Sequence, residues 1–184
     1  MARYLSGTRD VELLLIPGMT AVCADGVHAY VDADWADKED RRSTSGGMLF
    51  YHGCLVSSWS RRQGCVALST AESELYALGA GAIEALGFAS MLAEWHEICV
   101  PTLHSDSQSA LHVVKRRGPG RMKHMEIRTL ALQDWRQSHR LQVAKVPTED
   151  NPSDILTKVM PQERLARLGA AVGLVGGPFG RGRE

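Results

Sequence analysis

Residues 27–35 (VHAYVDADW) place the strongest constraint on how this chain can fold. Side chains alternate between the two faces of a β-strand, so the small apolar residues would line one face and Tyr30, Asp32 and Asp34 the other. Asp32 and Asp34 would then point the same way, about 6.5 Å apart. Because aspartate is a poor strand former, this pair predicts a role in metal binding or proton transfer. The alternative is an edge strand whose acidic face lies in water.

Two further strands and a long helix follow this stretch. Apolar runs at 45–51 and 54–59 are separated by His52 and Gly53, which suit a hairpin turn, so residues 27–62 predict three antiparallel strands. From residue 69 to about residue 98 the apolar period changes to three and four, which predicts a helix with an interruption near 79–81. Ser69 and Glu72 match a capping box, in which each satisfies a backbone amide of the other.

Three more acids stand at the edges of different predicted elements. Glu74 lies inside the long helix without a capping duty, Asp106 ends a strand that begins near Pro101, and Asp154 lies near the start of a helix opened by Asn151 and Pro152. Each has a structural alternative: a solvated helix face for Glu74, a helix N-cap for Asp106, and a favourable helix dipole for Asp154.

The remaining segments complete an alternation of strands and helices. Helices are predicted after Asp106 and at 123–137, a final strand at 141–146, and a short strand at 13–16. A short helix at 163–171 leads into a Gly-rich tail, residues 173–184, which is predicted to be disordered.

Composition narrows the possible partners. The 184 residues suffice for one domain with a core, and Lys+Arg equals Asp+Glu at 21 each, so a nucleic acid would have to be held by a local basic patch. The stretch 115–123 is the candidate patch, with five basic residues in nine. The four cysteines form no metal-binding or disulfide pattern, which favours a reducing intracellular location: the cytoplasm, the nucleus or a virus-like particle. No apolar run approaches about 20 residues, so no membrane partner is expected.

In order, these elements resemble the ribonuclease H domain of copia-type retrotransposon Pol polyproteins. The matching motifs are 30–36 (YVDADWA), 41–46 (RRSTSG), 58–60 (SWS), 67–74 (ALSTAESE), 105–110 (SDSQSA), 123–128 (KHMEIR), and 146–150 (VPTED) followed by 153–158 (SDILTK). The resemblance runs from about residue 3 to residue 160. It implies an α/β, ribonuclease H-like fold, with a mixed five-stranded sheet of three antiparallel strands and two parallel additions, flanked by helices.

The resemblance also implies a chemistry, the magnesium-dependent endonucleolytic hydrolysis of the RNA strand of RNA/DNA hybrids during reverse transcription. The family holds two Mg²⁺ ions, for which Mn²⁺ is a possible substitute, with four carboxylates that correspond here to Asp32, Glu74, Asp106 and Asp154. The resemblance implies that Asp32 bridges both ions, that Glu74 and Asp106 complete the site of one, and that Asp154 serves the other. Two such ions about 4 Å apart stabilise the attacking and the departing oxygen of a phosphodiester, so no side chain need be a nucleophile. Asp34 and Glu72 become neighbours rather than ligands.

Contacts to the hybrid are expected from two groups of residues. Thr70 and Gln108, next to proposed ligands, could donate hydrogen bonds to RNA 2′-hydroxyls, although both could equally be polar residues at helix starts. The basic stretch would contact backbone phosphates. Its proposed members are Lys115, Arg116, Arg117, Arg121 and Lys123.

The resemblance divides the chain into three parts and leaves rival functions open. Residues 1–25 would be a remnant of the reverse transcriptase and its connection, with the end of the polymerase at 3–8; residues 26–160 would be the ribonuclease H-like domain, and residues 161–184 the short helix and tail. The reverse transcriptase of the same polyprotein would be a partner. The alternative is an inactive or domesticated remnant that binds nucleic acid. A transposase or integrase with a related fold would need a catalytic glutamate where Asp154 stands.

Overall fold

The computed structural model describes residues 6–18, 25–35, 40–118 and 126–179, except the side chains of residues 126–129. In these ranges a central sheet is formed by β2 (Val27–Asp34), β3 (Thr44–Tyr51), β4 (Cys54–Arg62), β5 (Thr102–Ser105) and β6 (Gln142–Lys145). The strand order is β4-β3-β2-β5-β6, with β3 antiparallel to β2 and β4, and β5 parallel to β2 and β6. The predicted mixed sheet is therefore confirmed.

The hairpin between β3 and β4 turns at the predicted residues. His52 and Gly53 have φ angles of 47° and 79°. Positive φ at both central residues is typical of a type I′ turn, whose twist matches the twist of the flanking strands.

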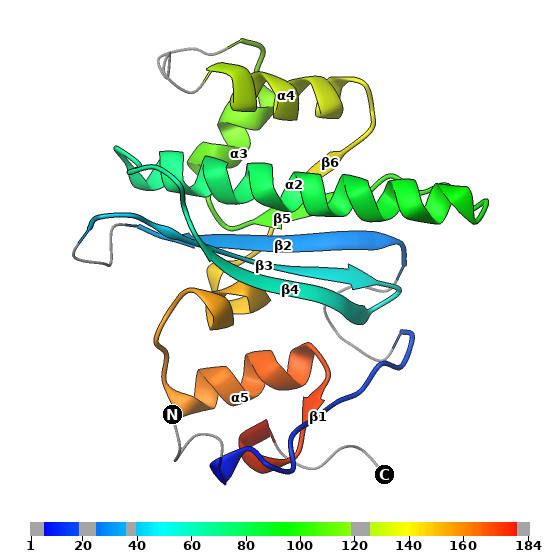
Figure 1. The fold of residues 1–184 in the computed structure, drawn as a ribbon, viewed down its shortest axis with the longest axis vertical. Coiled ribbons are helices and arrows are strands. Elements are labelled where there is room, and N and C mark those ends of the chain that lie inside the picture. The colour runs from blue at the N-terminus through cyan, green and yellow to red at the C-terminus, as the bar shows by residue number, and fades with distance from the viewer. Residues whose placement is uncertain (1–5, 19–24, 36–39, 119–125, 180–184) are drawn as a thin grey trace.

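Helices cover both faces of the sheet (Figure 1). One face carries α2 (Thr70–Glu94), α3 (Gln108–Lys115) and α4 (Glu126–Gln137), and the opposite face carries α5 (Gln162–Ala171) and the 3-10 turn η3 (Pro152–Leu156). A second 3-10 turn, η2 (Thr148–Asp150), precedes η3. The last predicted core helix begins as expected at Asn151, whose side chain accepts from the amide of Ser153, but it is a 3-10 turn rather than an α-helix.

Helix α2 runs through the predicted interruption at 79–81 without a break. A Cβ on Gly81 would lie 2.4 Å from Cγ1 of Val31, so the glycine lets α2 pack closely against β2. By length and composition α2 could cross a membrane, whereas the sequence analysis expected no segment of that kind. Its apolar residues have a partner within the fold, however, because Leu75, Leu78 and Ala82 are at most 2% exposed in the core beneath α2.

Strand β2 is the middle strand of the sheet and is buried on both faces. The predicted apolar face belongs to the core under α2 and consists of Val27, Ala29, Val31 and Ala33. The other face is covered as well, since Tyr30 packs with Phe50 and Val172, and Asp32 is fully buried. The edge-strand alternative for Asp32 is therefore wrong.

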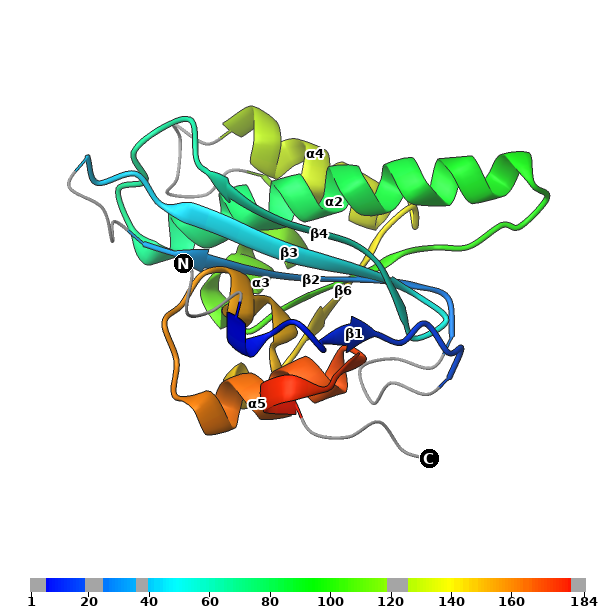
Figure 2. The same ribbon diagram turned by 60° about the horizontal axis from the view of Figure 1, so that its bottom comes forward.

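The C-terminal segment is ordered where disorder was predicted. β7 (Leu174–Val175) pairs antiparallel with β1 (Glu12–Leu13), and a 3-10 turn, η4 (Gly177–Phe179), follows it. Figure 2 shows this pair beside α5. Gly176 has a φ of 83°, and a Cβ there would lie 2.0 Å from the carbonyl oxygen of Asp10, so only glycine permits this approach. The disorder prediction is thus wrong for residues 174–179, while residues 180–184 lie outside the described ranges.

Candidate metal centre

Three carboxylates meet where β2 extends past the end of β5. β5 pairs with β2 only as far as the Tyr30–His104 pair, while β2 continues to Asp34. Asp32 lies on the part of β2 that pairs with β3 but not with β5, and Asp106 directly follows β5. Together with Glu74 from α2, they offer ligand oxygens that all lie within 4.8 Å of one another. The fold thus joins three acids that are far apart in the sequence.

Glu74 is the least compensated member of this group. Its side chain is buried, and its Oε2 has no hydrogen-bond partner among the described residues. Burial, followed by the charges of Asp32 and Asp106, raises the pKa of Glu74 to about 8, although a backbone hydrogen bond from Ala33 opposes the shift. The solvated-face alternative for Glu74 is therefore wrong.

The loop that carries Asp106 is fixed by its neighbours rather than by Asp106 itself. The amide of Ser107 donates to Oγ of Ser105 at 3.1 Å, and Ser107 is the N-cap of α3, since its Oγ accepts from the amide of Ala110 at 3.4 Å. The N-cap alternative for Asp106 is therefore wrong. Its carboxylate is half-buried, which leaves one side of the group accessible.

The group of three fits one divalent cation. Two buried acids and one half-buried acid converge, and Oε2 of Glu74 has no hydrogen-bond partner among the described residues. Hard oxygen ligands with an open side are what Mg²⁺ and Mn²⁺ take up, because these ions keep several waters. A cation here would also remove the repulsion between the like charges.

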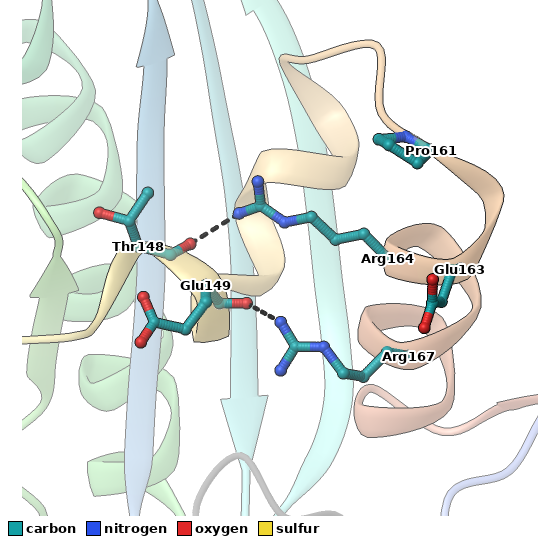
Figure 3. Close-up of a pocket in the computed structure, with 6 residues that line it drawn as sticks. All are labelled: Thr148, Glu149, Pro161, Glu163, Arg164 and Arg167. Carbon is teal, nitrogen blue, oxygen red and sulfur yellow. Dashed lines mark hydrogen bonds between the residues drawn. The ribbon is translucent and has the colours of Figure 1, made fainter.

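Asp154 is fully buried in η3, but the structure does not place it in the group of three. Its Oδ1 accepts from Nζ of Lys158 at 2.9 Å, and its Oδ2 accepts from the guanidinium of Arg164. Arg164 also donates to the carbonyl oxygen of Thr148 at 2.7 Å, as Figure 3 shows. Both oxygens of Asp154 thus have cationic partners supplied by the chain, and its predicted role as a metal ligand stays a prediction.

Lys158 connects Asp154 to Asp32. Its Nζ lies 3.0 Å from Oδ1 of Asp32, whose Oδ2 accepts from the hydroxyl of Thr157. Burial opposes the charged form of Lys158, but the hydrogen bond to Asp154 and the charge of Asp32 raise its pKa above the ordinary value. In this arrangement, a second cation bridging Asp32 and Asp154 does not fit unless Lys158 moves.

Sequence reasoning gave no role to Thr157, Lys158 or Arg164. A signal was present for Lys158, since it stands four residues after Asp154, the spacing at which a helical acid and base meet. Arg164 carried no such signal, because α5 is brought to Asp154 only by the tertiary fold.

Glu72 and Asp34, the predicted neighbours, remain outside the group of three. Oγ of Ser69 accepts from the amide of Glu72 at 3.2 Å, as predicted. The Glu72 carboxylate, however, accepts from the amide of Leu68 at 2.8 Å rather than from that of Ser69, so the capping box is only half formed.

The residues predicted to contact nucleic acid lie at the ends of helices. Thr70 and Gln108 are exposed at the starts of α2 and α3. At the end of α3, Lys115 and Arg117 are exposed and Arg116 is half-buried, while Arg121 and Lys123 lie outside the described residues.

Comparisons with known proteins agree with this fold. No family model matches the chain. Over 176 residues, 94% of the chain, it is 34% identical to the retrovirus-related Pol polyprotein from transposon TNT 1-94 of Nicotiana tabacum, and it spans 13% of that polyprotein. Among solved structures it is similar to LC11-RNase H1, isolated from compost, with a TM-score of 0.56 and 16% identity over 72% of this chain and 93% of that one. The same protein in complex with an RNA/DNA hybrid gives a TM-score of 0.51 and 16% identity over 71% and 93%.

These findings confirm the resemblance that the sequence motifs predicted. The likeness to LC11-RNase H1 concerns the fold, and the identity to the tobacco polyprotein extends over nearly all of this chain. The chain thus has the ribonuclease H-like fold and is homologous to one segment of the retrovirus-related Pol polyproteins of plant transposons.

Proposed function

We propose that this chain is a divalent-metal-dependent endonuclease that hydrolyses the RNA strand of RNA/DNA hybrids, as the ribonuclease H part of a retrotransposon Pol polyprotein. The observation that carries the proposal is the convergence of Asp32, Glu74 and Asp106, with a buried oxygen of Glu74 that has no hydrogen-bond partner within residues 6–18, 25–35, 40–118 and 126–179. A carboxylate in that state costs stability unless a cation binds beside it.

The proposed metal is Mg²⁺, with Mn²⁺ as a substitute, held by Asp32, Glu74 and Asp106. When bound, such an ion supplies charge stabilisation to the phosphodiester and activates water. The residues of this chain hold the ion in place: Asp32 and Glu74 are fixed by buried secondary structure, and Asp106 by the hydrogen-bonded turn before α3. The half-buried side at Asp106 is where a phosphate would approach.

The proposed substrate agrees with the surface around this site. Thr70 stands one turn before Glu74 and Gln108 stands two residues after Asp106, so both exposed side chains flank the ligands. Exposed Lys115 and Arg117, at the far end of α3, would contact backbone phosphates without reading sequence. The neighbour LC11-RNase H1 was solved with an RNA/DNA hybrid, which supports the same substrate here. The reverse transcriptase of the polyprotein is the proposed partner that helps to hold the hybrid.

One cleavage assay tests the proposal. The chain is incubated with a labelled RNA/DNA hybrid and Mg²⁺ or Mn²⁺, beside Asp106→Asn and a matched control, Asp134→Asn, which alters an exposed acid on α4. We expect cleavage of the RNA strand by the wild type and the control, at least about 100-fold slower cleavage by Asp106→Asn, and none in a chelator. Equal cleavage by both variants would contradict the proposal. Tight binding of the hybrid without any cleavage would instead identify a nucleic-acid-binding remnant.

A further inference from the structure

The ammonium group of Lys158 lies between two fully buried carboxylates. Its Nζ is 3.0 Å from Oδ1 of Asp32 and 2.9 Å from Oδ1 of Asp154, and the lysine side chain is 36% exposed. These two aspartates are the residues that a second metal ion would have to bridge, so a cation of the protein already stands between them.

The charges at the site balance with a single divalent ion. Asp32, Glu74, Asp106 and Asp154 provide four negative charges when ionised, and Lys158 and Arg164 provide two positive charges in direct contact with Asp154. The two remaining negative charges equal one divalent cation. A second ion would leave two uncompensated positive charges in a largely buried site, which is costly.

The geometry of the site also favours a single divalent ion. A Mg²⁺ ion takes oxygen ligands at about 2.1 Å, so an ion bridging Asp32 and Asp154 would overlap the position of Nζ. The aspartates are also restrained from the other side, Asp32 by Thr157 and Asp154 by Arg164, which is itself bonded to the carbonyl of Thr148. Lys158 would therefore have to leave before a second ion could enter.

We propose that Lys158 acts as the second cation of this site, so that the chain without substrate binds one divalent ion, at Asp32, Glu74 and Asp106, and excludes another between Asp32 and Asp154. The inference rests on the metal site of the proposed function and specifies its composition. Lys158 is a positioning residue here, because it acts by holding the two aspartates.

Counting bound Mn²⁺ ions tests this inference without any measurement of cleavage. The electron paramagnetic resonance signal of free Mn²⁺ is followed while the wild type, Lys158→Met and the matched control Lys145→Met are titrated to saturation; Lys145 is exposed at the end of β6. We expect one ion in the wild type and the control, and two in Lys158→Met. Only the last should show the spin–spin broadening of two ions about 4 Å apart.

The outcomes separate this inference from the proposed function. Two ions in the wild type, or one in both the wild type and Lys158→Met, would overturn the role of Lys158 and leave the nuclease proposal intact. No ion in the wild type would overturn both. Should Lys158→Met fail to fold, Lys158→Gln gives the same count with a neutral side chain that still donates a hydrogen bond to Asp32.

Discussion

The two halves of this acidic site both contain buried carboxylates but compensate the charges of these groups in different ways. In the open half, Asp32, Glu74 and Asp106 converge, and one oxygen of Glu74 has no hydrogen-bond partner in the part of the chain that the structure describes. In the closed half, both oxygens of Asp154 accept from cationic side chains of the same chain. A buried carboxylate needs a partner. The closed half supplies two cations to Asp154, whereas in the open half Lys158 and Thr157 reach Asp32 but leave Glu74 without a cationic partner in direct contact among the described residues.

This difference indicates which half needs a metal ion from solution to compensate its carboxylate charges. The open half is assembled from three elements distant in the sequence, and like charges there repel one another until a cation binds. The closed half is a salt-bridged anchor, in which Lys158 lies four residues from its acid and Arg164 joins η3 to α5. The stability of the open half should therefore depend on pH and on bound metal. The stability of the closed half should depend on Lys158 and Arg164.

The largest expected effect is a pH dependence that belongs to the open half alone. Without metal, the pKa of Glu74 is raised from 4.5 to about 8, first by burial and then by Asp32 and Asp106. Between these pH values the folded state binds one more proton than the unfolded state, so the free energy of unfolding falls as pH rises through this window. Since one pH unit corresponds to about 1.4 kcal/mol, the loss over this whole window is on the order of 5 kcal/mol.

Denaturant unfolding in a chelator, at about pH 5 and about pH 8.5, measures this loss. We expect Glu74→Gln to remove it, and saturating Mg²⁺ to reduce it in the wild type because the ion favours the ionised carboxylate. If the unfolding free energies of the wild type and Glu74→Gln changed in parallel with pH, Glu74 would not be the group responsible for the pH dependence.

The next effect in size distinguishes the two halves by metal affinity. Asp106→Asn removes a ligand of the open half, so the affinity for Mg²⁺ should fall by at least about 100-fold. Asp154→Asn removes only a more distant charge, and should lower the affinity by no more than about tenfold. Isothermal titration of both variants with Mg²⁺ gives the ratio. Equal losses would show that Asp154 is a ligand and that the two halves are one site.

The sequence predicted the secondary structure that carries this site better than the tertiary contacts of its side chains. The strands and the His52–Gly53 turn follow from local alternation and turn chemistry, which tertiary packing did not override, whereas the mixed sheet with two parallel additions was implied only by the family resemblance. The burial of Asp32 on the second face could not be predicted, because η3 packs against β2, and Thr157 and Lys158, which follow η3, contact Asp32 from more than 100 residues later in the chain. The same holds for Arg164, and for β7, whose pairing with β1 joins two ends of the chain that carry no pairing signal.

A smaller effect tests the anchor of the closed half, for which α5 offers a matched pair of arginines (Figure 3). Arg164→Met removes one of two cations from the fully buried Asp154, so the free energy of unfolding should fall by about 2 kcal/mol. Arg167 lies one turn later and pairs with Asp150, which is about half exposed, so Arg167→Met should cost less than about 1 kcal/mol. Denaturant unfolding in a chelator measures both. Equal losses would mean that Arg164 acts only through its contact with the Thr148 carbonyl or through packing.

The smallest effect is expected for Glu72→Gln, which tests whether burial alone makes an acidic residue a metal ligand. Glu72 is as buried as Glu74 and two residues away, but its carboxylate accepts from the amide of Leu68 and the hydroxyl of Tyr76. Glu72→Gln keeps one acceptor oxygen, for the amide of Leu68, and presents an NH2 group to the hydroxyl of Tyr76, which can accept from it. The substitution should therefore cost about 1 kcal/mol of unfolding free energy, the worth of weakened hydrogen bonds, and leave the Mg²⁺ affinity within about threefold of the wild type. A loss of affinity like that of Asp106→Asn would place Glu72 inside the open half, and the unpaired oxygen of Glu74 would then no longer distinguish the ligands from their neighbours.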